Sequence, residues 1–115
     1  MEKEFIPYEQ ALALKELGFD EPCFGYWNID PYLPNPTFNL VKPFDHEWCI
    51  PAPLYQQVFR WFREKHCKLG CIQKAIDRNR FVYLIDDIIF GFYDTYEEAE
   101  LACINKLIEL VKSKI

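Results

Sequence analysis

Proline residues are unusually dense between Asn28 and Pro53, and this segment constrains the fold more than any other part of the chain. The six prolines of the segment are Pro31, Pro34, Pro36, Pro43, Pro51 and Pro53. Because proline fixes the backbone φ angle and has no N–H to donate, such a segment cannot form a regular helix or a central strand. Aromatic residues are scattered through it, which favours order over disorder. The sequence therefore predicts a long ordered loop between regular elements.

The size and composition of the chain fit a single domain covering residues 1–115. Half of the residues are hydrophobic and 27% are charged, which suits a buried core beneath a solvated surface. No apolar run approaches the roughly 20 residues that span a bilayer, and the N-terminus lacks the pattern of a signal peptide. We therefore expect a soluble, cytoplasmic protein that has no contact with membranes and keeps its five cysteines reduced.

Two helices are predicted on either side of the proline-rich segment. The first covers about 7–17 and ends at Gly18, a residue suited to a left-handed stop, with Phe19 as the hydrophobic partner of a Schellman-type cap. The second covers about 53–67, with its large apolar side chains on one arc, and Gly70 is expected to stop it. One face of the second helix should therefore belong to the core.

The C-terminal half has the signatures of strands and of a last helix. Apolar runs with a period of two lie between 71 and 93, and Asp86 and Asp87 separate two of them as a hairpin turn would. Thr95 and Glu98 have the spacing of a capping box before an amphipathic helix. The sequence thus predicts an α+β fold in which three helices pack on a small, mainly antiparallel sheet.

Three stretches of the chain are similar in sequence to a known group of proteins. The stretches "PYEQALALKELGFDEPC", "PAPLYQQVFRWFREKH" and "TYEEAELACINKLIELVK" resemble small uncharacterised proteins encoded by phages and prophages of Bacteroidetes. The resemblance touches most of the length and weakens in the proline-rich loop and the strands. It implies a mobile-element context and an intracellular life, and it implies no activity and no functional residues.

Histidine and cysteine are grouped in two places that raise the question of a metal site. His46 and Cys49 form one pair, while His66, Cys67 and Cys71 lie together in "HCKLGC". A structural zinc site usually has two pairs of ligands at short, regular spacing, and these separations do not match it. On the second helix His66 falls at the edge of the apolar arc and Cys67 on the polar face. We therefore predict that these residues bind no metal.

The residues needed for catalysis are poorly represented. The only serine is Ser113, near the end of the chain, and the threonines are Thr37 and Thr95, the latter occupied in capping. A nucleophilic pair of cysteine and histidine stays open, because its geometry depends on the fold. Asp86 and Asp87 fit a turn better than a pair of catalytic carboxylates. With four glycines, none in a phosphate-binding loop, we expect neither a cofactor nor an enzyme.

Protein binding is the function that the aromatic residues favour. Side chains on a proline-stiffened loop offer contact area at low entropic cost, as tryptophan and tyrosine do at interfaces. The candidate contact residues are Tyr26, Trp27, Tyr32, Phe44 and Trp48. The sequence predicts an accessory protein that binds a host or phage protein through them. The alternative is that the loop only covers the sheet and closes the core.

Nucleic-acid binding is the second candidate function. A basic surface is possible between Arg60 and Arg80, because this stretch contains seven basic residues and only two acidic ones. Its candidate contacts are Arg60, Arg63, Lys68, Arg78 and Arg80. The formal net charge of −5 opposes this function, as does the expected burial of Trp61 and Phe62, and the alternative is a solvated basic face. The run of six acidic residues without a basic one from Asp86 to Glu100 is a charge asymmetry that could orient a partner.

Overall fold

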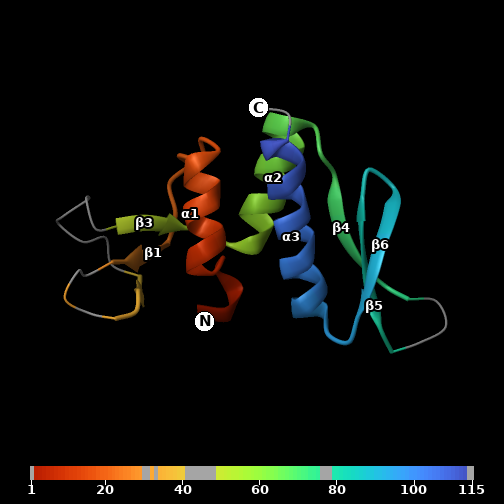
Figure 1. The fold of residues 1–115 in the computed structure, drawn as a ribbon, viewed down its shortest axis with the longest axis horizontal. Helices are drawn as coiled ribbons and strands as arrows, with labels where there is room; N and C mark the ends of the chain where they lie inside the picture. The colour runs from red at the N-terminus through yellow and green to blue at the C-terminus, as the bar shows by residue number, and fades with distance from the viewer. Residues whose placement is uncertain (1, 30–31, 33, 41–48, 76–78, 114–115) are drawn as a thin grey trace. The chain divides into compact units, whose positions relative to one another are not determined.

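The computed structural model describes residues 2–29, 32, 34–40, 49–75 and 79–113. Within these residues it has three α-helices and two three-stranded antiparallel sheets, which confirms the predicted α+β class (Figure 1). The strands lie in two sheets where the sequence suggested one. The chain forms two compact units, Met1–Tyr55 and Gln56–Ile115, each with its own sheet. That the two units make up one domain stays a prediction.

The N-terminal unit combines one helix with a sheet of short strands. Its elements are η1 (Glu2–Glu4, a 3₁₀ turn), α1 (Tyr8–Glu16), β1 (Gly25–Asn28), β2 (Thr37–Asn39) and β3 (Cys49–Ala52). The strand order is β2-β1-β3, with both pairs antiparallel. Gly25 lets the ring of Phe38 lie against the backbone of β1, because a Cβ at Gly25 would lie only 2.6 Å from Cζ of Phe38.

Strands β2 and β3 lie inside the segment predicted as a continuous loop, so that prediction is wrong at these two places. Both are edge strands, and Pro51 of β3 stands opposite Tyr26 of the central strand β1. A proline cannot donate to a ladder, but an edge strand needs only half of its backbone groups for pairing. The prolines therefore excluded a central strand, as expected, and not an edge strand.

Helix α1 ends as its sequence predicts. Gly18 has a φ of 100°, and its N–H donates to the carbonyl of Lys15 at 3.1 Å. The N–H of Phe19 donates to the carbonyl of Leu14 at 3.0 Å, which completes a Schellman motif. The side chains of Phe19 and Leu14 are both buried. This confirms the predicted cap, with Phe19 buried as its hydrophobic residue.

The C-terminal unit contains a three-stranded meander that one helix precedes and another follows in the chain. Its elements are α2 (Tyr55–His66), β4 (Gly70–Lys74), β5 (Phe81–Ile85), β6 (Ile88–Tyr93) and α3 (Tyr96–Lys112). The strand order is β4-β5-β6, all antiparallel. Helix α3 packs against all three strands, along one side of the sheet (Figure 1). No helix in the described part of the chain is long and apolar enough to cross a membrane.

Gly70 sets the closeness of the packing in this unit. A Cβ at Gly70 would lie 3.0 Å from Sγ of Cys103, 3.1 Å from Cδ1 of Leu107 and 3.2 Å from Cδ1 of Phe59. Strand β4 therefore approaches α3 and α2 more closely than a side chain would allow. Cys103 and Leu107 are fully buried in α3, and Trp61 and Phe62 are buried in α2, as the helical pattern predicts.

Two local signals in the C-terminal unit are confirmed. Thr95 caps α3, because its hydroxyl oxygen accepts from the N–H of Glu98 at 3.1 Å and its hydroxyl contacts the Glu98 carboxylate at 3.0 Å. Asp86 and Asp87 form the two-residue turn between β5 and β6, with φ values of 52° and 70°. Positive φ at both positions is the geometry of a type I′ hairpin, in which aspartate is tolerated.

The second helix ends earlier than the sequence suggests, and Gly70 is not its stop. Helix α2 ends at His66, and Cys67 takes the left-handed conformation with a φ of 53°. The N–H of Lys68 then donates to the carbonyl of Phe62 at 3.1 Å, which turns the chain toward β4. A residue with a Cβ, other than Asn or Asp, is strained at this φ because its Cβ lies too close to the following carbonyl oxygen.

Replacing Cys67 with glycine should therefore stabilise the protein. The side chain is exposed, so its removal costs little packing, while glycine adopts positive φ without the Cβ clash. We expect Cys67→Gly to raise the free energy of unfolding by about 0.5–1 kcal/mol, measured by urea denaturation under reducing conditions. Cys67→Ala is the matched control and should bring no such gain. A loss of stability in the glycine variant would contradict the assigned conformation.

Candidate functional site

Trp27 is part of the framework of the N-terminal unit. Its indole Nε1–H donates to the carbonyl oxygen of Ile6 at 2.8 Å. Its ring packs against Phe38, with centroids 5.5 Å apart, and against the edge of Tyr8, with centroids 6.4 Å apart. The neighbouring Tyr26 is half-buried, as Trp27 is. These contacts anchor β1 to the N-terminal segment, and a role of Tyr26 and Trp27 at a partner surface stays a prediction.

Tyr32 is the candidate that the structure exposes most. Its side chain is 93% exposed, and it lies between β1 and β2. Two other large apolar side chains of this unit, Phe24 and Leu40, are also exposed. The predicted contacts Phe44 and Trp48 lie outside the described residues. Of the described candidates, Tyr32 is therefore exposed to solvent, whereas Trp27 packs against Phe38 and donates a hydrogen bond to Ile6.

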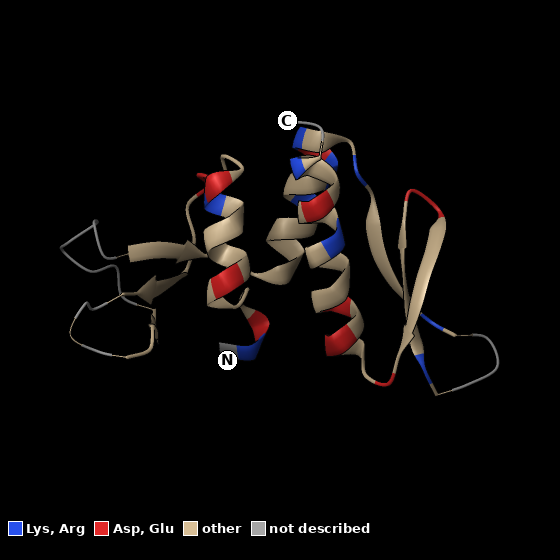
Figure 2. Ribbon diagram, in the orientation of Figure 1, with Lys and Arg blue, Asp and Glu red and all other residues tan. Residues whose placement is uncertain are grey.

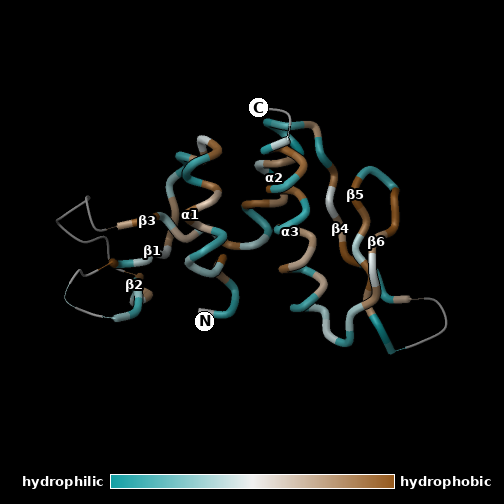
Figure 3. The backbone as a smooth tube through the Cα atoms, in the orientation of Figure 1, coloured by the Kyte–Doolittle hydropathy of each residue, from teal (hydrophilic) through white to brown (hydrophobic). Residues whose placement is uncertain are grey.

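A second apolar surface lies on β6, and the sequence reading missed it. Ile88, Ile89 and Phe92 are 61%, 63% and 62% exposed, and Figure 3 shows the hydrophobic character of this strand. The stretch "IIFGFY" predicts a strand, and its sequence alone does not show which of its side chains are exposed. The predicted fold as a whole did contain a signal for this exposure. A small sheet with helices on one side only leaves its other face open to solvent, so some apolar side chains of an outer strand should be exposed.

The described candidate basic residues of the C-terminal unit lie toward both ends of its sheet. Arg60 and Arg63 are exposed on α2, and Lys68 follows that helix, near the end of the sheet where Gly70 pairs with Ile85. Arg80 precedes Phe81, which pairs with Lys74 at the other end of β4, about 13 Å away at the rise of a strand. Figure 2 shows Lys and Arg at both ends of this sheet.

Two of these cations also have acidic neighbours. Lys68 Nζ lies 3.4 Å from Oδ2 of Asp86, and Arg80 Nε lies 3.9 Å from Oδ1 of Asp94. The first pair is partly shielded from solvent, while the second is exposed and weak. Arg78 lies outside the described residues. A phosphate group would therefore compete with a carboxylate for Lys68 and Arg80.

Asp86 has a structural task that its sequence position alone does not reveal. Its carboxylate accepts from the backbone N–H of Leu69 at 2.9 Å, in addition to its contact with Lys68. Its own backbone N–H donates to the carbonyl of Leu69 at 2.9 Å. The β5–β6 turn is thereby tied to the connection between α2 and β4, which leaves little reason to assign Asp86 to acid-base chemistry.

The candidate metal ligands of the sequence can be compared with the described part of the fold. Among the described residues, no three His, Cys, Asp or Glu side chains come together as metal ligands. His66 packs against the rings of Trp61 and Phe62, with centroids 4.8 Å and 5.9 Å away, while Cys67 is exposed. Cys49 is buried in β3 of the other unit. Since His46 lies outside the described residues, the absence of metal stays a prediction.

The thiols that can be assessed are poor nucleophiles. Burial, and secondarily the negative charge of Glu21, raises the pKa of Cys23 to about 12. Burial likewise raises the pKa of Cys103 to about 12. At neutral pH both thiols are therefore protonated, and neither lies in the electropositive setting that activates a catalytic cysteine.

Glu100 is a half-buried carboxyl on α3 and should make stability depend on pH. Burial, and secondarily the charge of Glu97, raises the pKa of Glu100 from its ordinary value of 4.5 to about 7. The folded protein then holds a proton that the unfolded chain releases above about pH 4.5. The free energy of unfolding should therefore fall as pH rises from about 4.5 to 7 and stay lower above pH 7.

The contribution of Glu100 can be isolated with an isosteric variant. Glu100→Gln cannot ionise, so the fall in stability between pH 5 and pH 7 should be smaller in this variant, measured by urea denaturation at each pH. Glu97→Gln is the matched control on the exposed side of the same turn and should retain most of the fall. Identical pH profiles for Glu100→Gln and the unmodified protein would show that Glu100 is ionised normally.

Comparison with known proteins gives no relative. No family model matches the chain, and no curated protein or solved structure matches it significantly.

Proposed function

We propose that the protein is a non-enzymatic accessory protein of phage or prophage type that acts in the cytoplasm. In this proposal it binds a host or phage protein through its aromatic, proline-rich segment. The observation that carries the proposal is the 93% exposure of Tyr32 on a segment that a three-stranded sheet supports. A large aromatic side chain held in solvent gains much contact area on binding. The resemblance of the sequence to small phage proteins supports the same context.

The proposal assigns two roles to the predicted aromatic residues. Trp27 holds the segment through its contacts with Ile6 and Phe38, and Tyr32 makes contact with the partner. Phe44 and Trp48 remain proposed contacts. A side chain that is already packed, as that of Trp27 is, lowers the entropic cost of binding, because it need not be immobilised when the partner binds.

Nucleic-acid binding is the second candidate, through the exposed Arg60 and Arg63 of α2. It ranks second because Lys68 and Arg80 lie beside carboxylates and at different ends of the sheet. The net charge of −5 also repels a polyanion.

Capture on the immobilised protein tests the preferred function. Tyr32→Ala should reduce the amount of a specifically retained protein by at least about tenfold, the loss typical of an aromatic anchor at an interface. The matched control is Tyr96→Ala, which removes a partly exposed tyrosine from the other unit and should leave the retained amount unchanged. If Tyr32→Ala retains as much of the partner as the unmodified protein, the aromatic segment is not the binding surface.

A further inference from the structure

Strand β6 is an outer strand of its sheet. The order β4-β5-β6 pairs one edge of β6 with β5, and no strand of the described residues pairs with its other edge. Such an edge presents backbone N–H and C=O groups to which another extended chain can pair. Natural edges are usually protected by charges or covered, whereas β6 reads "IIFGFY" without a charged residue.

Apolar side chains extend from this edge on both faces of the sheet. Ile88 pairs with Ile85, which shares its face with Gly70 and therefore with α3. Ile89, the next residue, points to the opposite face, as side chains alternate along a strand. Both isoleucines are more than 60% exposed. An added strand would therefore bury apolar surface above and below it, and it should itself be apolar at consecutive positions.

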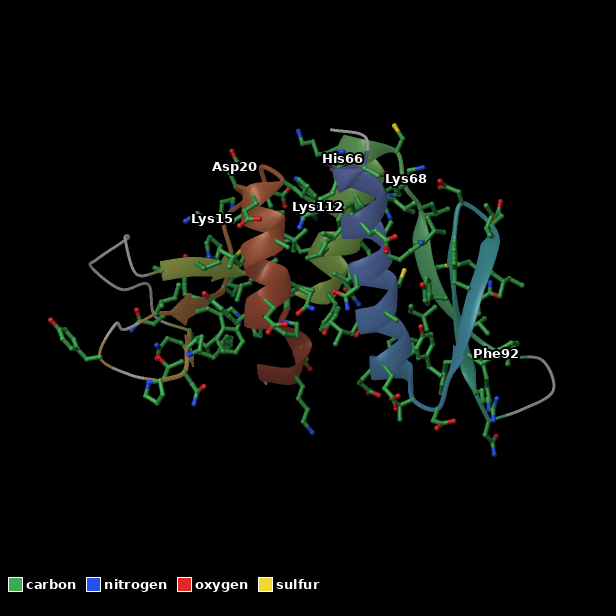
Figure 4. The ribbon with its side chains drawn as sticks, viewed as in Figure 1. Lys15, Asp20, His66, Lys68, Phe92 and Lys112 are labelled. Atoms are coloured by element: carbon green, nitrogen blue, oxygen red, sulfur yellow. The ribbon has the colours of Figure 1, made fainter. Side chains whose placement is uncertain are left out.

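A bulge limits how much of the edge can be used. Phe81 pairs with Tyr93 and Tyr83 pairs with Phe90, so one residue of β5 faces both Gly91 and Phe92. Gly91 has a φ of 46°, as the first residue of a glycine-type bulge does. Bulges twist an edge away from regular pairing. The regular part of the free edge is therefore 88–90. Figure 4 shows Phe92 beyond it, on the side away from α3.

Acidic residues stand at both ends of the strand. Asp87 precedes β6 and Asp94 follows it, and both are exposed. No Lys or Arg lies between Asp86 and Glu100. Asp94 lies beyond the bulge and 3.9 Å from Arg80, so Asp87 is the carboxylate next to the regular part of the edge. A partner with Lys or Arg at the end that meets Asp87 would place opposite charges together there.

A second copy of this chain does not offer that opposite charge. If two β6 strands paired antiparallel over 88–90, with Ile89 opposite Ile89, Asp87 of each copy would stand opposite the uncharged Gly91 of the other. The partner that complements the charge at this edge is therefore a different chain.

From the edge, its apolar side chains and the acidic Asp87 beside it, we propose that 88–90 bind an extended segment of a partner protein by strand addition. The segment has about three consecutive apolar residues, the number that the regular part of the edge can pair, with lysine or arginine next to them where the segment meets Asp87. The surface lies in the C-terminal unit and does not depend on the aromatic segment of the proposed function.

Synthetic peptides test this proposal directly. The first probe is the capped peptide KKVIVKK, added to the full-length protein while its backbone amide resonances are recorded by NMR. The largest shifts should occur at Ile88, Ile89 and Phe90. A peptide with the flanks exchanged, EEVIVEE, should bind at least about tenfold more weakly, as several like charges would now meet. Methylation of the central peptide nitrogen should also weaken binding, because it removes a backbone donor.

Three variants separate the edge from other apolar surface. Ile89→Thr keeps a β-branched residue in the strand and should weaken binding of KKVIVKK at least about fivefold, because apolar contact is lost. Phe24→Ser removes a similarly exposed apolar side chain from the other unit and should leave binding unchanged. Tyr32→Ala should also leave it unchanged, which distinguishes this surface from the aromatic segment.

Four results would overturn the proposal. The first is the absence of shifts at 88–90 with millimolar peptide. The second is equal binding of the basic and acidic peptides, and the third is undiminished binding of the methylated peptide. The fourth is a dimer in sedimentation that Ile89→Thr dissociates, which would identify a second copy as the occupant of the edge.

Discussion

Leu107→Ala should lower the free energy of unfolding of the C-terminal unit by about 3 kcal/mol, within the range measured for leucine truncations in closely packed cores. Leu107 is fully buried, and its Cδ1 lies near the position that a Cβ on Gly70 would occupy. Helix α3 and strand β4 are held close there, so neighbouring atoms cannot easily fill the space that truncation leaves. The loss should appear in urea denaturation followed by the amide resonances of β4, β5 and β6.

Ile89→Ala provides the matched control in the same unit. The side chain has the same number of carbon atoms as leucine, but it is 63% exposed on β6. Its truncation should change the free energy of unfolding by about 0.5 kcal/mol or less. If both variants lost the same amount, Ile89 would be buried and the apolar edge of β6 would not exist.

Trp27→Ala should destabilise the N-terminal unit by about 3–5 kcal/mol, as removal of a packed aromatic side chain usually does. The substitution deletes the ring contacts with Phe38 and Tyr8 and leaves the Ile6 carbonyl without its indole donor. Trp27→Phe separates the two effects. It keeps most of the ring and loses the hydrogen bond, so about 1–3 kcal/mol should be lost. The amide resonances of β1, β2 and β3 report the unfolding of this unit.

Tyr32→Ala is the counterpart of this substitution. Because its side chain is 93% exposed, its removal should change stability by about 0.5 kcal/mol or less. The two aromatic residues were equivalent candidates in the sequence, and their variants should differ most in stability. A large loss of stability for Tyr32→Ala would mean that the residue belongs to the core of the unit and is not available to a partner.

The features that could be predicted are those that neighbouring residues determine. The cap at Gly18 and Phe19, the capping box at Thr95 and the turn at Asp86 each depend on a few adjacent side chains and backbone angles. Such local preferences are legible without the fold. For the same reason the α+β class was predictable, because the helical and alternating periods are properties of short segments.

The features that were missed depend on contacts between distant segments. Gly70 was expected to stop the second helix because glycine is the usual stop. Gly70 instead lies in β4, where it packs closely against Cys103 and Leu107, and Cys67 ends the helix in the left-handed conformation. Exposure is also a property of the whole fold. Neither the anchoring of Trp27 by Ile6 nor the open position of Ile89 could be derived from local sequence, since both depend on which segments become neighbours.

The central claim is that the protein binds another protein and not a nucleic acid, and capture with and without nuclease tests it most directly. The protein would be immobilised, exposed to a Bacteroidales lysate with or without nuclease, and the retained proteins identified by mass spectrometry. The account predicts a specific protein whose retained amount is unchanged by nuclease and by alanine at Arg60 and Arg63, but falls with Tyr32→Ala. Retention that disappears with nuclease, or with the two arginines, would contradict it and make α2 the binding site.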